Sequence, residues 1–283
     1  MSNELSTSVA NVPDFIASAT DAPKGLEEVQ KVMQPSIMRV VQALTQDEIV
    51  ARDQVPGDVV LMPERTCVFD SKAETIKPTR IVPVFFFTEW CVWNPLKTKG
   101  QLPFIRERSM DPNGDIARKA KTPDLRKEPC PEMPTESLRY MEHLTYLVVL
   151  MEESGPPAPV LLSFVSGEHK TGRRFANMIV SRGVPIYAGA YEFITSERRN
   201  PQGKWFGLDI SNSSEPWVTQ EQFEIFKQLH IDLKERIVGG DIIIDYEAAV
   251  DDGDVHAGDE EPPQDGYHDF EGAEDENSVQ AGL

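Results

Sequence analysis

The sequence predicts a β-rich α+β fold, in which a small barrel or open sheet has helices inserted between its strands. Three observations predict it. Several segments are rich in β-branched and aromatic residues, and Arg80–Trp93 (RIVPVFFFTEWCVW) is the strongest of them. Only a few stretches have helical apolar spacing, and turn signals such as Pro56-Gly57-Asp58 separate the segments. With 283 residues, of which 40% are hydrophobic, the chain is large enough for a packed core.

The strands are expected on both sides of the long aromatic segment. The segment Ser36–Leu44 fits a helix or a strand, because its periodicity does not decide. The sequence Asn-Pro-Gln-Gly at 200–203 predicts a hairpin between the last two strands. In chain order, strands are predicted at 59–62, 66–69, 80–93, 138–151, 159–166, 185–196 and 204–209.

Two helices have clear start or stop signals. The segment 168–182 has helical spacing and is followed by Gly183, as expected at a helix C-terminus. Its inward residues are predicted to be Phe175, Met178 and Ile179, and its outward residues Lys170, Arg173 and Arg174. A capping box at 219–222 opens a second helix, with Phe223, Phe226, Leu233 and Ile237 as its apolar residues. A short helix at 26–33 is also expected.

Composition divides the chain into three parts. Residues 1–25 are polar and lack periodicity, which predicts a disordered arm. Residues 26–240 carry the strand and helix patterns of one domain. Within it 94–134 is predicted to be a long loop, which is functional or partly disordered. Residues 250–283 are acidic and without a core pattern, which predicts a disordered tail.

The formal net charge of −19 is unevenly distributed. Residues 80–208 carry 18 basic and 14 acidic residues, a net charge of +4, whereas residues 251–283 carry 12 acids and no Lys or Arg. A polyanionic ligand is therefore not excluded by the total charge. No window of 18 apolar residues and no signal-peptide pattern is present, and the three cysteines are widely spaced. These features predict a protein of a reducing cytoplasm without disulfides.

Known enzyme motifs are missing from the sequence. Ser166–Thr171 resembles a phosphate-binding loop, but His169 stands where the glycine before Lys170 is required. There is no nucleophile elbow and no dinucleotide-binding glycine pattern. The histidines and cysteines show no chelating spacing in the sequence. We therefore expect no enzymatic activity, no cofactor and no metal.

The basic middle of the chain interleaves cations with aromatic rings, as expected for a protein that binds single-stranded nucleic acid by stacking and charge. Two thirds of the rings are expected to be core, with Phe86 and Phe193 foremost. The loop cations are equally compatible with a solvated loop. The candidate binding residues are Trp90, Trp93, Lys97, Lys99, Arg106, Arg108, Arg118, Lys119, Lys121, Lys170, Arg173, Arg174, Tyr187, Tyr191, Arg198, Arg199, Lys204 and Trp205.

The order of several segments resembles a family of tailed-bacteriophage single-stranded DNA-binding proteins. The segments are Gln34–Leu44, Pro56-Gly57-Asp58, the aromatic strand ending Trp93-Asn94-Pro95, the TYLVVL and PVLLSF strands with their basic helix, and the aromatic hairpin. The resemblance implies an OB-like barrel with an acidic C-terminal tail, acting in the host cytoplasm. Relatives with clustered cysteines suggest zinc, but only Cys130 stands in the corresponding loop.

The expected function is binding of single-stranded DNA without strong sequence preference in phage replication or recombination. In this hypothesis the tail at 251–283 competes with DNA or recruits replication, recombination or transcription proteins. The alternative is an interaction protein that acts on a host polymerase or nuclease through a DNA-mimicking tail. The sequence leaves the oligomeric state and the choice between RNA and DNA open.

Overall fold

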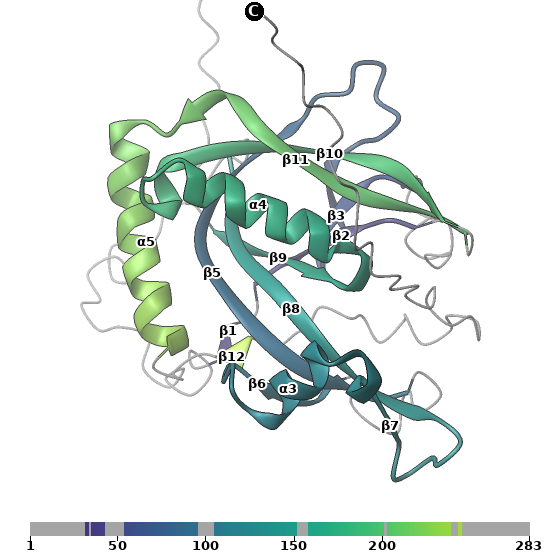
Figure 1. Ribbon diagram of the computed structural model, residues 1–283. Helices are drawn as coiled ribbons and strands as arrows, with labels where there is room; N and C mark the ends of the chain where they lie inside the picture. Colours follow the sequence, from purple (N-terminus) through teal and green to yellow (C-terminus); the bar gives the residue numbers. More distant parts are fainter. Residues whose placement is uncertain are drawn as a thin grey trace, which may run out of the picture.

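A computed structural model describes residues 32–33, 35–42, 54–95, 105–151, 158–200, 203–238 and 243–244. In this part of the chain a ten-stranded sheet curls into a half-barrel, and three α-helices pack on it (Figure 1). The β-rich α+β prediction is confirmed. The main strand order is β11-β10-β5-β8-β9-β2-β3-β4, with β6 paired to β5 and β7 to β8.

The strands lie close to their predicted positions. The strand pairs described in the large sheet are antiparallel, except that β2 and β9 are parallel. The strands are β2 (Ile37–Val40), β3 (Val59–Met62), β4 (Thr66–Phe69), β5 (Thr79–Trp93), β6 (Ile105–Ser109), β7 (Lys127–Pro129), β8 (Ser137–Leu150), β9 (Pro159–Val165), β10 (Gly189–Asn200) and β11 (Gly203–Trp217). The ambiguous segment 36–44 therefore contains a strand.

The pair β5 and β8 forms the centre of the sheet. Both strands are apolar on two faces because each face is covered by a helix. Their register shifts between Pro83 and Phe85, where an extra residue is inserted into β5. Such a bulge reverses the alternation of side chains between the two faces. Accordingly, Val82 and Phe87 contribute to the same core cluster although their positions differ by an odd number.

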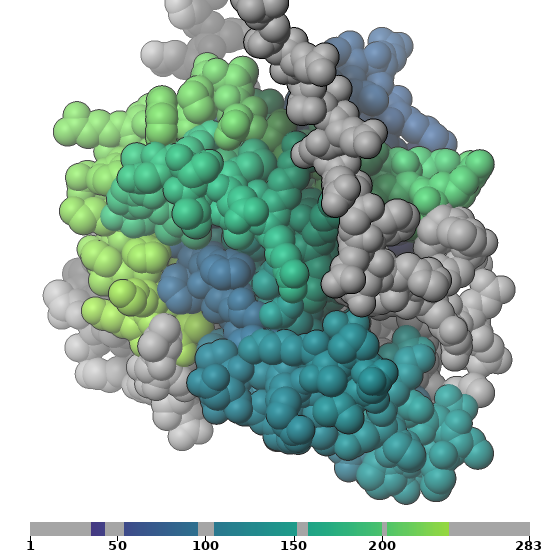
Figure 2. Space-filling model, in the orientation of Figure 1, coloured from purple at the N-terminus to yellow at the C-terminus, as the bar shows by residue number. Residues whose placement is uncertain are grey.

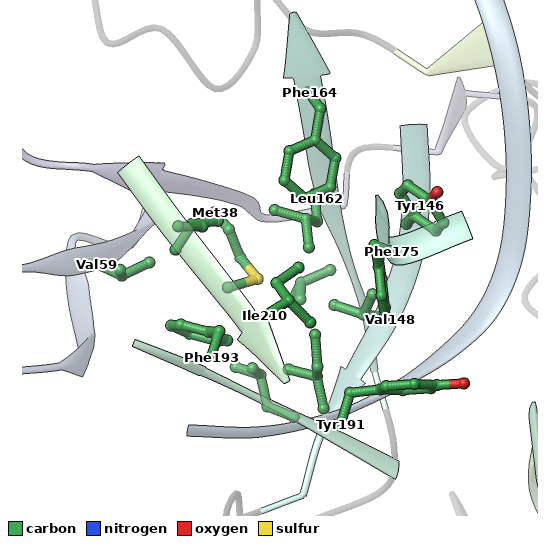
Figure 3. Packing of buried hydrophobic residues seen from close by; sticks show 14 of the residues in the cluster. Met38, Val59, Tyr146, Val148, Leu162, Phe164, Phe175, Tyr191, Phe193 and Ile210 are labelled. Atoms are coloured by element: carbon green, nitrogen blue, oxygen red, sulfur yellow. The ribbon is translucent and has the colours of Figure 1, made fainter. Parts of the chain in front are cut away.

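Helix α4 (His169–Ser181) covers the concave face of the sheet. Phe175 is fully buried against Tyr146 and Tyr191, with ring centroids 4.8 and 5.0 Å apart. Figure 3 shows these rings with Phe164 and Phe193 in one cluster. The predicted inward and outward faces of this helix are confirmed, and Gly183 has the positive φ of 63° expected after the helix end.

Helix α5 (Gln220–Val238) covers the opposite face of β5 and β8. The capping box is present: the Thr219 amide donates to Gln222 Oε1 at 3.0 Å, and the Gln222 amide donates to Thr219 Oγ1 at 3.3 Å. The predicted apolar residues Phe226, Leu233 and Ile237 are buried against the sheet. Phe223 is half-buried and packs on Tyr187, 5.2 Å between centroids.

The prediction of a long loop at 94–134 is wrong for its described part. Residues 105–140 form a lobe with β6, helix α3 (Asp115–Lys121), the 3-10 turn η3 (Pro123–Leu125) and β7. We call it the α3 lobe. Its core joins Ile116, Ala117 and Ala120 of the helix to Trp90 and Tyr140 of the sheet. The elements are short, and this explains why no sustained period marks them in the sequence.

Three further expectations differ from the structure. Val32–Met33, expected at a helix end, is the short strand β1 and pairs in parallel with β12 (Ile243–Ile244). Strand β10 begins only at Gly189, after the 3-10 turn η5 (Ile186–Ala188); a further turn, η4 (Ser166–Glu168), precedes α4. Strand β11 extends to Trp217, whereas the predicted strand ended at residue 209.

The predicted arm at 1–25 and tail at 250–283 lie outside the described residues. None of the described helices is both long and apolar enough to span a membrane.

Candidate nucleic-acid interface

The exposed side of α4 carries three cations and no carboxylate. Lys170, Arg173 and Arg174 follow the spacing of one helix face and are all exposed, whereas Gly172 and Phe175 on the other face are buried. Only Arg173 forms an ion pair, at 3.3 Å from Glu142 Oε2, and its side chain remains 68% exposed. The helix sequence HKTGRRFANMIVS contains no acid. It is thus a local concentration of positive charge in an acidic chain.

The β10–β11 hairpin is tied to the beginning of this helix. Arg198 donates to Glu168 Oε1 at 2.8 Å and to Thr171 Oγ1 at 3.1 Å. The indole of Trp205 contacts the same Glu168 oxygen at 3.4 Å. Burial raises the pKa of Glu168, and the Arg198 charge opposes that rise. Arg198 therefore holds the hairpin against α4, and its charge is used within the protein.

Two further cations are exposed near the hairpin tip, where Arg199 lies opposite Lys204. Lys204 forms an ion pair with Glu197 at 2.7 Å. Among the described residues, no ion pair involves Arg199, Lys170 or Arg174. Arg199 and Lys204 lie on the face of the hairpin opposite to Arg198 and Trp205, because side chains alternate between the two faces along a strand. We therefore call Lys170, Arg173, Arg174 and Trp205 the α4–hairpin surface.

Phe86 of β5 is an aromatic residue on the α4 side of the sheet that reaches the surface. Phe86 is 37% exposed, although the sequence predicted it as core, and its ring lies 4.7 Å from that of Tyr146. Tyr146 in turn donates a hydrogen bond from its hydroxyl to the Gly172 carbonyl of α4, at 2.9 Å. In Figure 2, blue atoms from the region of β5 are visible between α4 and the α3 lobe. An exposed ring thus lies close to the cationic helix.

The cations of the α3 lobe mostly have partners within the lobe. Arg106 forms two hydrogen bonds with Glu132, at 2.7 and 3.0 Å, and Arg118 pairs with Asp115. The Lys119 ammonium lies 2.7 Å from Glu128 and lowers the pKa of that carboxyl. The Lys121 ammonium donates to the Pro112 carbonyl and lies 4.7 Å from the Trp90 ring centroid. Because nearby carboxylates and a carbonyl already contact these cations, they are weaker candidates for binding phosphate than Lys170 and Arg174, which have no carboxylate partner among the described residues.

Most of the predicted stacking rings are not accessible. Trp90 is only 4% exposed and Tyr191 1%, so neither ring offers a face to a base. Tyr187 packs on α5, with its ring 5.2 Å from that of His230. Trp93 is half-buried and stacks on His143. Phe193 is buried as predicted. Of the predicted rings, Trp205 is half-buried and contacts Glu168 just before the cationic helix. Lys97 and Lys99 lie outside the described residues.

A buried polar cluster was missed by the sequence analysis. Glu89 and Cys91 lie two residues apart on one face of β5, and His143 lies opposite Glu89 on β8. All three are at most 4% exposed. Burial, together with the smaller effects of the nearby His169 and Arg108, lowers the pKa of His143 to about 3. Burial also raises the pKa of the Cys91 thiol. The Glu-x-Cys pair was visible in the sequence, but its histidine partner depends on strand register.

The fold and this surface define a strand-rich α+β protein with a cationic helix on a curled sheet. The chain matches the family model described as Pam3 phage gp34-like protein over residues 68–238, which is more than half of its length, and it belongs to this phage protein family. The matched region runs from β4 to the end of α5. No curated protein and no solved structure matched the chain significantly.

Proposed function

We propose that this phage protein binds single-stranded DNA without strong sequence preference, through the α4–hairpin surface. The observation that carries the proposal is helix α4, with three exposed cations and no acid in a chain of net charge −19. Cations that track a phosphate backbone supply most non-specific affinity. Within the described residues, Lys170 and Arg174 have no carboxylate partner that would compete for them.

Two rings support stacking beside this charge. Phe86 is exposed beside Tyr146, and Trp205 is half-buried at the junction of α4 and the hairpin. Base stacking on such rings contributes about 1–3 kcal/mol per base. Stacking on these rings does not depend on the DNA sequence, because every base has a π face. The proposed role in replication or recombination follows from the affinity of such a protein for unpaired strands.

The test is a titration of fluorescent oligo-dT with the full chain at several salt concentrations above about 0.1 M. The variant Lys170→Gln/Arg174→Gln removes two proposed phosphate contacts. For single strands each contact contributes about 0.7 to the slope of log K against log salt, so the slope falls by about 1.4. At 0.1 M salt the same relation gives a loss of affinity of about 25-fold.

A matched control removes the same charge from another helix. Lys227→Gln/Lys234→Gln changes two exposed cations of α5, a helix that also carries exposed acids such as Glu221 and Glu224. This variant is expected to keep the salt slope of the original protein. Absence of oligo-dT binding by the full chain, or an equal loss in both double variants, would contradict the proposal.

A further inference from the structure

The side chains of Glu89, Cys91 and His143 converge in the buried cluster. One carboxylate oxygen, the thiol sulfur and one imidazole nitrogen all lie within 4.8 Å of one another. Pairs of ligands in a tetrahedral zinc site are separated by roughly 3.3–3.8 Å, given metal–ligand bonds of 2.0–2.3 Å. Small rotations of the three side chains would therefore bring the atoms around one ion.

From this juxtaposition we propose that Glu89, Cys91 and His143 bind a divalent transition-metal ion of the Zn²⁺ class. The donor set of one sulfur, one nitrogen and one oxygen is suited to zinc and not to Mg²⁺ or Ca²⁺, which prefer oxygen ligands. With three protein ligands, a fourth position is left for a solvent molecule. The site is independent of the proposed DNA interface, because it lies on the opposite face of β5 from Phe86.

The surroundings of His143 fit a metal ligand. Its Nδ1 lies 3.5 Å from the Ser163 hydroxyl, which in turn lies 3.2 Å from the Thr145 hydroxyl. Metal-bound histidines commonly donate their second N–H to such a partner.

The cluster is poorly placed to act as a Cys–His–Glu catalytic triad. Cys91 has no exposed surface, so a substrate carbonyl cannot reach its sulfur in this conformation. A raised thiol pKa also keeps the sulfur protonated in the absence of a cation. A small ion that enters during folding avoids both obstacles, because its charge stabilises the thiolate.

Trp93 provides a built-in reporter of occupancy. Its indole Nε1 donates to His143 Nε2 at 3.2 Å, and the two rings stack 5.7 Å apart. If the ion binds Nε2, it takes the lone pair that the indole uses. If it binds Nδ1, the proton moves to Nε2 and faces the indole N–H. In either case the Trp93 hydrogen bond is broken, and its fluorescence must change.

Arg108 is the competing cation of the site. It lies opposite Cys91 across the β5–β6 pair, and its charge lowers the pKa of both Cys91 and His143. It therefore favours the thiolate but repels a bound cation.

The experiment uses the full chain without a histidine tag, treated with a chelator and titrated with Zn²⁺ or Co²⁺. We expect one equivalent to bind, with a thiolate-to-Co²⁺ charge-transfer band and a change in tryptophan fluorescence. Trp93→Phe is expected to keep the stoichiometry and lose most of the fluorescence change. Ser163→Ala is expected to weaken binding by about 10-fold, as for other outer-shell partners.

The sulfur is identified by cysteine variants. Cys91→Ser is expected to abolish the charge-transfer band, whereas Cys130→Ser, which removes another buried thiol, and Cys67→Ser, which removes an exposed one, are expected to keep it. If Cys91→Ser fails to fold, the band in the latter two variants still assigns the sulfur by elimination. Absence of the band in the original protein, or its loss in Cys130→Ser or Cys67→Ser, would overturn the proposal.

Discussion

Helix α4 approaches the sheet closely at Gly172, and replacement of this residue by alanine tests how the helix is held. A Cβ atom at this position would lie 2.8 Å from Phe164 Cβ, 2.9 Å from Phe164 Cγ and 3.1 Å from Leu144 Cδ1. The Cβ atom is fixed by the backbone of β9, and the Cγ atom is held by the packing of the Phe164 ring, which is 1% exposed. The new methyl group must therefore displace the helix.

The magnitude follows from two opposing effects. Alanine in a helix is favoured over glycine by about 1 kcal/mol. Overpacking a close-packed core costs about 1–3 kcal/mol. Because the contacts at Gly172 involve atoms fixed near the backbone, we expect the cost at the upper end and a net loss of about 1–2 kcal/mol. For a domain of this size the melting temperature falls by about 2–4 °C per kcal/mol.

Urea unfolding followed by circular dichroism measures this loss. The matched control is Gly167→Ala, in the turn before α4, where no heavy atom lies within 4 Å of the added Cβ. We expect the control to stay within about 0.5 kcal/mol of the original protein. A Gly172→Ala variant as stable as the original, or more stable, would refute the close approach of α4 to β9.

Three other predictions concern stability and titration. Arg182 donates to the carbonyls of Pro216 and Ala190 and to Asn212 Oδ1, so Arg182→Ala is expected to cost at least about 2 kcal/mol in urea unfolding, and a smaller loss would contradict these contacts. Phe86→Ala is expected to cost under about 1 kcal/mol, whereas Trp90→Ala costs about 3–5 kcal/mol, and the reverse order would contradict the exposure of Phe86 and the burial of Trp90 under the α3 lobe. Arg106 lowers the pKa of the Glu132 carboxyl to about 2. The stabilisation by this pair is therefore present above the unfolded pKa of about 4.3 and is lost as the pH falls through about 2. A midpoint above about 4 in an NMR titration of this carboxyl would contradict the prediction.

The long elements were predictable because their signals are local. The strand at 80–93 and the helix at 168–182 each carry enough apolar residues at one period to determine their type. The positive φ at Gly183 and the capping box at 219–222 were predicted correctly because both depend on residues within one turn. Burial of the helix faces then followed from the same periods.

The assignment of Phe86 and Trp90 could not be made from local pattern. Without the bulge after Pro83, Phe86 would share the face of Val82 and point toward α5. The extra residue moves it to the face of α4, where it is partly exposed. Trp90 is covered by the α3 lobe, a unit that the sequence pattern did not reveal.

Local sequence pattern also could not show which cations have carboxylate partners. The cations of the α3 lobe looked available because their carboxylate partners are separated from them by up to 26 residues. Such pairs are set by tertiary structure and have no fixed spacing in the sequence. On α4 the reverse holds, because the helix itself contains no acid and its exposed stripe was predicted from spacing alone.

The uneven charge also predicts how binding depends on salt. At 0.1 M salt the Debye length is about 10 Å, so a bound strand interacts mainly with the α4–hairpin surface. At 0.01 M it is about 30 Å, and the net charge of −19 then repels the strand. Affinity for oligo-dT is therefore expected to pass through a maximum at intermediate salt.

Deleting residues 251–283 removes 12 negative charges and changes the net charge to −7. We expect the truncated protein to lose most of the decline in affinity at low salt, and to bind oligo-dT as tightly as the full chain or more tightly. Loss of all activity in the truncated protein would instead favour a tail that acts directly on a partner.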